Sequence, residues 1–558
     1  MSKSMRVHSG FGRGLCAGAA ALLVTVAGGA AGQAELAASS HPRSAESGVT
    51  RLLGEPRPGI DVPAVVMSPL SVSTRPTTSD FATALDADLD AAMALGGLET
   101  VHLVGLPLSA GELIDLDLER VRVTDPDAVI IHGDQQAARR GDEPLNVMFS
   151  GEVAGEPDSW AYVSFSRYGV RGIVEIAGET HIISSGKLGL PAGSVVEPVV
   201  YNLTHLPEGE ISWVEFACSV IDTPAVEGEG DGPVAARGSE EEPDPCRVVD
   251  VVIETDAEFG GLFTGSGNDG LAAQEAHNAY VESLVGANNV IYGRNVNVRL
   301  NIVAVRSWVG AEQGDDPWEG TSTFSRLLEL RAAWTPTSTP IAVDEWQSVH
   351  MFSGARLGGG IAYLSAICNP NFSHAVSADL SGFFPTTEVS PDVFEPISNR
   401  SQNWDVVVTA HEWGHNFGAP HTHGLTPIFD GCGLGDCSDA ENGTIMSYCQ
   451  LCPGGVANIE LNFADRILNE GIRPYLNFEA RCDLEEVDAE CDTPIAEEER
   501  CLADVNEDGV LSFSDFIAWL VYFNQGDLRA DINVDGQITG GDFNAWLVAF
   551  NLGCEGYD

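Results

Sequence analysis

Three histidines and a glutamate stand at regular intervals in one short segment of the chain. Residues 411–421 read His-Glu-Trp-Gly-His-Asn-Phe-Gly-Ala-Pro-His. In a helix, His411 and His415 lie one turn apart on the same face, so both imidazoles can reach one tetrahedral metal ion. Glu412 stands beside them and can take a proton from a metal-activated water. The spacing therefore predicts a zinc centre with a general base.

The rest of the segment provides a third ligand. Residues 405–410, Asp-Val-Val-Val-Thr-Ala, predict one helix that continues through His415, and Gly418 marks the place where that helix must end. The chain then turns back, so that His421 can ligate the metal from the opposite side. Three imidazoles leave one zinc position open, and zinc lowers the pKa of a bound water towards about 7. A bare His-Glu-x-x-His occurs by chance in many helices, but the extension to His421 adds constraints of position and type.

A second short segment supports this interpretation. Residues 443–448 read Gly-Thr-Ile-Met-Ser-Tyr. Together the two segments resemble the metzincin metallopeptidases, in which a methionine-containing turn lies beneath the zinc. The resemblance implies that Met446 forms this turn. It also implies that Tyr448, as in the similar turns of astacins and serralysins, can approach the metal.

Within the metzincins, residues 246–482 most resemble the reprolysin, or adamalysin-like, branch. The similarity lies in Val-Asp-Val-Val-Ile-Glu-Thr-Asp at 249–256, in Gly-Ile-Ala-Tyr-Leu at 360–364, and in His-Asn-Phe-Gly at 415–418. It implies a mixed sheet with an active-site helix. It also implies that the strand containing residues 360–364 pairs with an extended peptide substrate.

The residues after the third ligand depart from the reprolysin pattern. Reprolysins usually have Asp there, whereas this chain has Thr422 and His423. His423 is therefore an alternative zinc ligand, although its spacing does not fit the motif. The turn at 446–448 likewise resembles the astacin and serralysin turn.

The region 35–225 is expected to be a β-rich prodomain. Alternating stretches such as 159–166 predict strands, and residues 148–185 resemble a reprolysin prodomain. Reprolysins use a prodomain cysteine to keep the enzyme latent, and this region contains one cysteine, Cys218. A thiolate is a strong zinc ligand, so Cys218 is a candidate latency thiol. The residues around it lack the usual flanking pattern, and a disulfide, for instance to Cys246, is the alternative.

Cysteine usage indicates an oxidising compartment. The chain has 12 cysteines, and Cys16 would leave with a signal peptide. The others should mostly form disulfides, and their odd number leaves one thiol over. A C-x4-C…C-x2-C cluster could hold a second zinc, but export of the protein favours disulfides there. This cluster consists of Cys432, Cys437, Cys449 and Cys452.

The N-terminus, residues 1–34, has the pattern of a signal peptide. Basic residues precede the apolar run 15–31, and small residues suit cleavage near Ala34. An uncleaved membrane anchor is the alternative, but the run is rich in Gly and Ala and is weakly hydrophobic for a stable span. We therefore expect a secreted protein, which could also attach to a cell surface, with no membrane span after signal removal.

Acidic segments separate the expected domains. Linkers at 226–245 and 483–500 are rich in Glu and Asp, and the first is suited to proteolytic cleavage. Between them, strand-like and helix-like segments alternate, which predicts a mixed α/β catalytic domain at 246–482. The expected strands are 248–253, 297–305 and 348–352, and the expected helices are 270–292 and 323–334.

The C-terminal unit, residues 501–558, contains an internal repeat. Asp-Val-Asn-Glu-Asp-Gly at 504–509 recurs as Asp-Ile-Asn-Val-Asp-Gly at 531–536. Both copies place oxygen ligands at the positions of an EF-hand-type loop, which suits about two structural Ca²⁺ ions. The expected ligands are Asp504, Asn506, Asp508, Ser512 and Asp515 in the first loop, and Asp531, Asn533, Asp535, Thr539 and Asp542 in the second.

Two such loops, each followed by a short helix, resemble a small α-helical dockerin module. Dockerins bind cohesin modules and attach enzymes to scaffolds or surfaces, so the resemblance implies a cohesin-like or cell-surface partner for residues 501–554. Asp rather than Glu at the last ligand position departs from the common EF-hand. Cys501 and Cys554 bracket the repeat and could form a clasp.

Composition limits the classes of partner and function. The 558 residues include 82 acidic and 28 basic side chains, and the formal net charge is −54. Such a chain is unsuited to nucleic acid or to anionic membrane surfaces. We expect a secreted zinc endopeptidase tethered through its C-terminal module. A catalytically inert metzincin-fold adhesion or scaffold protein is the alternative, against which the intact Glu412 argues, and a carbohydrate-active enzyme is another because dockerins often accompany those.

Overall fold

A computed structural model describes most of the chain between residues 63 and 487. The described residues are 63–74, 81–133, 138–139, 145–185, 198–206, 212–213, 218–222, 246–264, 270–311, 314–335, 346–385, 401–402, 405–480, 482 and 484–487, with helical positions at 516, 518–520, 522–523 and 546. The chain divides into two compact units between residues 49 and 50, and every described residue belongs to the second. The expected signal peptide, the linker 226–245 and all ten expected calcium ligands lie outside the described residues.

The first of two large sheets, here called the N-terminal sheet, has the order β1-β4-β5-β8-β9-β10-β11-β12-β3-β2. Its strands are β1 (Ala64–Met67), β2 (Leu70–Val72), β3 (Thr83–Ala87), β4 (Thr100–Ser109), β5 (Glu112–Val121), β8 (Asn146–Val153), β9 (Glu156–Ser166), β10 (Gly169–Ile176), β11 (Glu179–Ser184) and β12 (Val199–Asn202). Helix α1 (Leu89–Ala94) and a 3-10 turn, η1 (Leu95–Gly97), follow β3. Neighbouring strands are antiparallel except β1 and β4, as expected for meandering hairpins.

Both faces of the N-terminal sheet are covered. Alternate residues of β8 and β9 point to opposite sides, so Phe149 and Val163 join one hydrophobic cluster while Met148 and Tyr162 join another. The second cluster also contains residues from the helices of the C-terminal part of the chain. This packing explains why most of β8 and β9 is buried rather than alternating between buried and exposed.

The second large sheet, here called the mixed sheet, has the order β14-β18-β19-β17-β15-β16-β6-β7, and β23 pairs with the start of β15. Its strands are β6 (Thr124–His132), β7 (Ala138–Arg139), β14 (Ser219–Asp222), β15 (Cys246–Thr255), β16 (Val298–Ser307), β17 (Ser348–Phe352), β18 (Gly360–Leu364), β19 (His374–Ser377) and β23 (Glu485–Val487). The central strands from β6 to β19 run parallel, and β18 is antiparallel to β19. The expected mixed sheet is confirmed, but it takes strands from both sides of the expected linker 226–245.

Helices cover the mixed sheet. They are α2 (Ala257–Gly260), α3 (Leu271–Val296), α4 (Thr323–Ala333), α5 (Asp405–Asn416) and α6 (Asp465–Ile467), and two π-helical turns, η8 (Leu468–Ile472) and η9 (Tyr475–Glu479), follow α6. Short strands form two further pairs, β13 (Ser212–Trp213) with β20 (Ser401–Gln402) and β21 (Gly443–Thr444) with β22 (Ile459–Glu460). Single 3-10 turns lie at η3 (Thr422–Gly424), η4 (Cys432–Leu434), η5 (Ala440–Asn442), η6 (Cys449–Leu451) and η7 (Gly455–Asn458).

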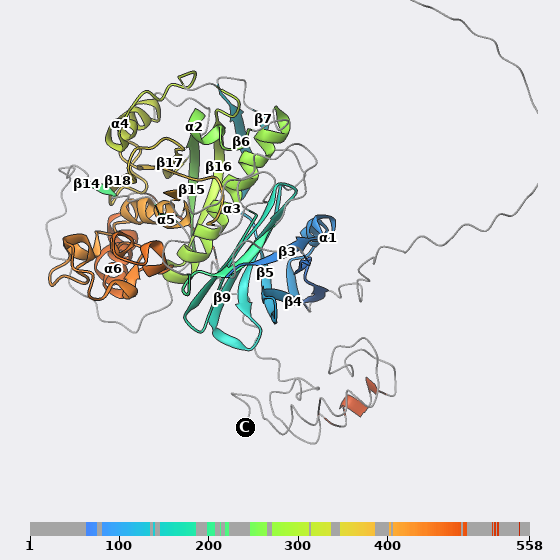
Figure 1. The fold of residues 1–558 in the computed structure, drawn as a ribbon. Helices are drawn as coiled ribbons and strands as arrows, with labels where there is room; N and C mark the ends of the chain where they lie inside the picture. Colours follow the sequence, from blue (N-terminus) through green and yellow to red (C-terminus); the bar gives the residue numbers. More distant parts are fainter. Residues whose placement is uncertain are drawn as a thin grey trace, which may run out of the picture. The chain divides into compact units, whose positions relative to one another are not determined.

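Helix α3 has no exposed face along most of its length, since residues 276–293 are all buried. It contacts β16 and α5 as well as β8 and β9 of the N-terminal sheet, and it is the long green helix in Figure 1. A helix covered on every side needs no polar stripe, which accounts for the absence of a clear amphipathic pattern at 271–296. The helix begins and ends close to the predicted limits, 270–292.

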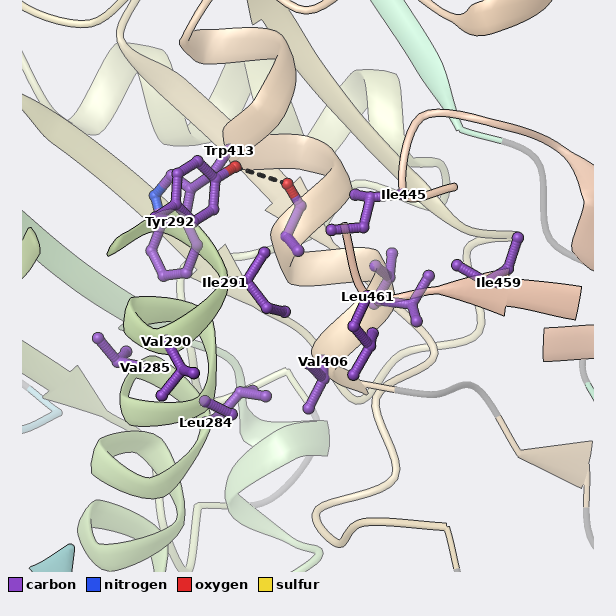
Figure 2. Packing of buried hydrophobic residues seen from close by; sticks show 14 of the residues in the cluster. Leu284, Val285, Val290, Ile291, Tyr292, Val406, Trp413, Ile445, Ile459 and Leu461 are labelled. Atoms are coloured by element: carbon purple, nitrogen blue, oxygen red, sulfur yellow. Dashed lines mark hydrogen bonds between the residues drawn. The ribbon is translucent and has the colours of Figure 1, made fainter. Parts of the chain in front are cut away.

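Apolar side chains from α3, α5 and the segment after α5 meet in one cluster. Figure 2 shows Leu284 and Ile291 of α3 close to Val406 of α5, with Leu461 nearby. All four side chains are buried to 2 % exposure or less. Burying such side chains stabilises the fold by about 1.5–3 kcal/mol each, so this cluster holds α5 against α3.

Three disulfides connect described cysteines of the C-terminal part. Cys368 pairs with Cys482, and the cluster at 432–452 forms the pairs Cys432–Cys449 and Cys437–Cys452. The disulfide prediction for that cluster is therefore confirmed, and the alternative of a second zinc site there is wrong. Within the described part of the chain, no helix is long and apolar enough to cross a membrane.

The packing around α3 gives a stability prediction. Leu284→Ala should lower the free energy of unfolding by about 2–5 kcal/mol, because it leaves a cavity in the cluster between α3 and α5. Leu271→Ala on the same helix is the matched control, since Leu271 is 69 % exposed and such changes usually stay within about 0.5 kcal/mol. Urea unfolding followed by tryptophan fluorescence measures both variants. Equal midpoints for the two would contradict the packing described.

Candidate active site

Helix α5 is fixed at its first residue, Asp405. The Asp405 carboxylate accepts hydrogen bonds from Tyr280 Oη at 2.6 Å and from the backbone N–H groups of Ser381 and Gly382 at 2.9 and 3.0 Å. Burial raises the pKa of Asp405 to about 7, so these donors are what stabilise its charge. A carboxylate at this position also complements the positive end of the helix dipole.

Both flanks of α5 are tied to neighbouring elements by buried polar groups. Tyr292 of α3 donates a hydrogen bond to the backbone oxygen of Ala410 at 2.7 Å, drawn as the dashed line in Figure 2. On the other flank, Asn416 Nδ2 donates to the backbone oxygen of Tyr363 in β18 at 2.8 Å. Helix α5 is therefore held between α3 and strand β18 of the mixed sheet. All twelve of its residues are buried.

The end of α5 depends on Gly418. Its φ is +95°, a left-handed conformation that favours glycine, and an added Cβ would lie 2.8 Å from Tyr475 Cβ. The chain turns back immediately afterwards, and the backbone oxygen of Ala419 accepts a hydrogen bond from His415 Nδ1 at 2.7 Å. This reversal brings His421 opposite the helix, as the sequence predicted.

The three histidines converge on one point. His421 Nε2 lies 3.1 Å from His415 Nε2 and 3.2 Å from His411 Nε2. Nitrogens bound to one tetrahedral zinc at the usual Zn–N distance lie about 3.3 Å apart, so the spacing fits that metal. Among the described residues, this triplet is a group of potential metal ligands in which His411 and His415 are buried and His421 is partly buried.

The tautomers of two ligands are fixed by backbone carbonyls. His411 Nδ1 contacts the oxygen of Ile445 at 2.7 Å, and His415 Nδ1 contacts that of Ala419. A carbonyl can only accept, so both Nδ1 atoms carry the proton and both Nε2 atoms present lone pairs. Burial lowers the pKa of His411 to about 4 and that of His415 well below its usual value, which keeps both rings neutral. Neutral imidazoles with convergent lone pairs are what a divalent metal requires.

Glu412 is fully buried next to this triplet. Neither of its carboxylate oxygens has a partner in good hydrogen-bond geometry among the described residues, although the Cys218 thiol lies beside them. Burial raises the pKa of Glu412 well above the usual value, and the contact with Cys218 offsets only part of that rise. A buried, unpartnered carboxylate is costly and marks a place where a ligand or water belongs. Gly360 of β18 lies against it, and an added Cβ there would be 2.2 Å from Glu412 Oε1. Strand β18 and the Glu412 carboxylate therefore border the same site.

Met446 is fully buried in the hydrophobic core, and its sulfur lies against Gly414 of α5. Its backbone oxygen accepts a hydrogen bond from the N–H of Thr422 at 3.1 Å, while the preceding carbonyl, of Ile445, holds His411. The turn at 445–446 thus holds His411 directly and holds Thr422, the residue next to His421.

Tyr448 and His423 border the triplet without joining it. The Tyr448 ring centroid lies 4.8 Å from that of His421, and its hydroxyl donates to the backbone oxygen of Cys218. The His423 ring stacks on His421 at 5.1 Å with an interplanar angle of 12°. In this structure His423 therefore packs against a ligand, and the convergent set is His411, His415 and His421.

Cys218 lies at the same site although it precedes the helix by almost 200 residues. Its side chain is buried and unpaired, so the alternative disulfide to Cys246 is wrong for this structure, where Cys246 is in another disulfide. The thiol sulfur, a His411 nitrogen and a Glu412 oxygen all lie within 4.8 Å of one another. The residues that follow Cys218 form β14, which pairs in parallel with β18 from Ser219 to Asp222.

Sequence reasoning missed the residues that position α5. Asp405 and Tyr292 lie in segments that read as ordinary helix, and no local motif distinguishes them. Asn416 lies within the His-Asn-Phe-Gly segment, but nothing local predicts its bond to β18. The one available signal was the lack of an amphipathic stripe at 271–296, which indicates a helix buried on every side.

One family model matches the part of the chain that contains this site. Residues 246–458 match the family model Reprolysin_5, metallo-peptidase family M12. Among solved structures, the chain is similar to metalloproteinase-II from Bacteroides fragilis at 11% identity and a TM-score of 0.37, over 74% of this chain and 98% of that one. It is also similar to a chaperone-substrate complex at 11% identity and a TM-score of 0.21, over 48% of this chain and 28% of that one.

The family match covers the segment that contains the mixed-sheet strands from β15 to β19, the helix α5 and the three converging histidines. Together, the family match and the histidine geometry support a metallopeptidase, whose candidate active site lies in residues 246–458.

Proposed function

We propose that the chain is a secreted zinc-dependent endopeptidase of the metzincin type, made as a latent precursor. The observation that carries the proposal is the convergence of three Nε2 atoms beside the unpartnered carboxylate of Glu412. The His411, His415 and His421 side chains would hold one zinc ion. Bound there, zinc would supply Lewis acidity towards a peptide carbonyl and make water more acidic.

The residues of the chain have separate tasks in peptide-bond hydrolysis. Glu412 takes a proton from the attacking water and later delivers it to the leaving amine. Strand β18 lies at the border of the site and offers backbone groups to an extended substrate, in the way that sheet edges bind peptides. Tyr448 lies close enough to the ligand His421 to contact a substrate group at the metal.

The role of Glu412 is tested by Glu412→Gln in the processed enzyme. The variant should bind zinc normally yet lose nearly all casein hydrolysis, because the ligands remain and only the proton acceptor is removed. Glu441→Gln, at an exposed position of the same region, is the matched control and should keep full activity. Metal content by mass spectrometry and casein cleavage with and without a chelator give the two readouts.

The same assay separates the proposed function from the other two classes. Near wild-type turnover of zinc-loaded Glu412→Gln would show that the base is assigned wrongly. No cleavage of any protein by the wild-type enzyme would favour an inert adhesion or scaffold protein, and hydrolysis of polysaccharides would favour a carbohydrate-active enzyme.

We further propose that residues 35–225 act as a prodomain and that Cys218 maintains latency. The buried, unpaired thiol within 4.8 Å of His411 and Glu412 supports this role, since a thiolate is a strong zinc ligand. Strand β14 pairs with β18, where an extended substrate would bind. Tyr448 donates a hydrogen bond to the backbone oxygen of Cys218 and is likewise not free to contact a substrate. The thiol and the strand therefore exclude substrate together.

Cys218→Ala tests the latency proposal in the uncut protein. Loss of the thiol should raise peptidase activity above that of the uncut wild type, because one of the two blocking contacts is gone. Mass mapping of the exported wild-type protein should find Cys218 as a free thiol. A Cys218 disulfide in that protein, or an unstable variant without activity, would instead indicate a structural role.

For residues 501–558 we propose a dockerin-like module that binds about two Ca²⁺ ions and attaches the enzyme to a cohesin-like or cell-surface partner. Aromatic residues from the two repeats support a paired arrangement, since the rings of Phe516 and Trp546 lie 5.4 Å apart. Trp519 and Trp546 are both buried. The proposed ligands run from Asp504 to Asp515 and from Asp531 to Asp542.

Calcium binding can be measured directly by titration calorimetry on the full-length protein. The wild type should take up about two Ca²⁺ ions in this module, because clustered carboxylates repel each other until cations neutralise them. A variant with Asp504→Ala and Asp531→Ala removes the first ligand of each loop and should lose that uptake. Equal uptake by the two proteins would rule out these loops as the calcium sites.

A further inference from the structure

Strands that precede the linker 226–245 lie at both ends of the mixed sheet. At one end, β14 pairs with β18 beside the candidate active site. At the other end, β6 pairs in parallel with β16, and β7 closes the edge. The C-terminal part of the chain therefore has neither edge of its sheet free.

The attachment at β6 is extensive. Backbone hydrogen bonds join Ile302 N–H to the oxygen of Val123 at 2.6 Å and Gly133 N–H to that of Ser307 at 2.7 Å. The Arg306 guanidinium also donates to the oxygen of Gly133 at 3.1 Å. These contacts lie at both ends of β6, and the register pairs Thr124 and residues 129–132 with β16 on either side of an irregularity at 125–128.

The β6 strand also completes a hydrophobic core on one face of the mixed sheet. Ile131 is 5 % exposed and belongs to a cluster with Val252, Leu327 and Trp334, all from the other side of the linker. Removing β6 would take Ile131 out of this cluster and leave backbone groups of β16 unpaired. Obligate interfaces have this character, a hydrophobic core divided between two partners.

A third attachment runs along α3. Tyr162 donates to the backbone oxygen of Ser283 at 2.8 Å, and Asn146 donates to that of Ala279 at 2.8 Å. Both donors lie on the N-terminal sheet and are buried. In contrast, the segment of the N-terminal part of the chain that lies at the active site is short. It consists of Cys218 and the four residues of β14.

We infer that cutting the linker does not free the active site, because the N-terminal fragment stays bound as a noncovalent subunit through β6 and α3 and keeps β14 on β18. This inference rests on the proposed latency. Activation then requires a second event, a further cleavage within the N-terminal fragment or its forced dissociation. The fragment acts as an inhibitor whose attachment lies mostly outside the active site.

The test uses the full chain with a recognition sequence for a specific protease placed in the linker 226–245. After cutting, both fragments should elute as one species from a gel-filtration column at micromolar concentration. Cys218 should stay as unreactive towards a thiol reagent as it is in the uncut protein. Separation of the wild-type fragments in native buffer, or full reaction of Cys218 in the cut complex, would overturn the inference.

A pair of variants assigns the attachment to β6. Ile131→Ala should weaken association of the cut fragments at least about thirtyfold, because it removes buried atoms from the shared core. Leu113→Ala, in the same fragment but at a side chain that is 63 % exposed, should leave association unchanged. Equal association for both variants would place the attachment elsewhere and contradict the role given to β6.

These readouts do not depend on peptidase activity. If the zinc-loaded enzyme cleaves no protein even after the N-terminal fragment has been fully digested, the proposed function fails. Co-elution and thiol reactivity still decide whether the fragment stays bound, so the two failures can be told apart.

Discussion

Helix α5 carries two imidazoles and a carboxylate into a region where none of its twelve residues reaches solvent. Burial of so many polar groups is costly unless each one has a partner, and the surrounding structure is arranged to supply those partners. Hydrogen bonds tie the helix to its neighbours along its length. They are made by Tyr280 to Asp405, by Tyr292 to the Ala410 backbone, and by Asn416 to β18. Among the described residues of the helix, the side-chain atoms without a partner are the two Glu412 oxygens, Trp413 Nε1 and Asn416 Oδ1. Of these, a Glu412 oxygen lies beside a His411 nitrogen, where chemistry is expected.

The same constraint explains the elements that surround the helix. The carbonyls of Ile445 and Ala419 are placed to fix two ligand tautomers, so the turn after the helix and the turn at 445–446 have related tasks. The disulfides Cys432–Cys449 and Cys437–Cys452 connect the segment that follows His421 to the segment that follows Met446. These disulfides limit movement of the irregular backbone that holds His421 and Tyr448.

Local spacing was sufficient to predict the three converging histidines, the position of Glu412 beside them, the turn at Gly418, the strands β15 to β18 and the helices α3, α4 and α5. It could not predict what depends on pairing between distant segments. The bond between Tyr292 and Ala410 joins residues 118 positions apart, and neither carries a local signal. Strand β6 was missed as part of the mixed sheet because its register with β16 is set by shared burial. Its Pro126 is typical of a sheet margin rather than of a strand paired on both sides.

The complete burial of α3 has a consequence for how the molecule exchanges hydrogen with solvent. Residues 276–293 can exchange their amide protons only when the covering layers open, so these amides should be among the slowest in the protein. One side of that cover is the N-terminal sheet, through β8 and β9. Exchange along a single helix would therefore report the departure of that sheet from the rest of the chain, without any need to observe a reaction.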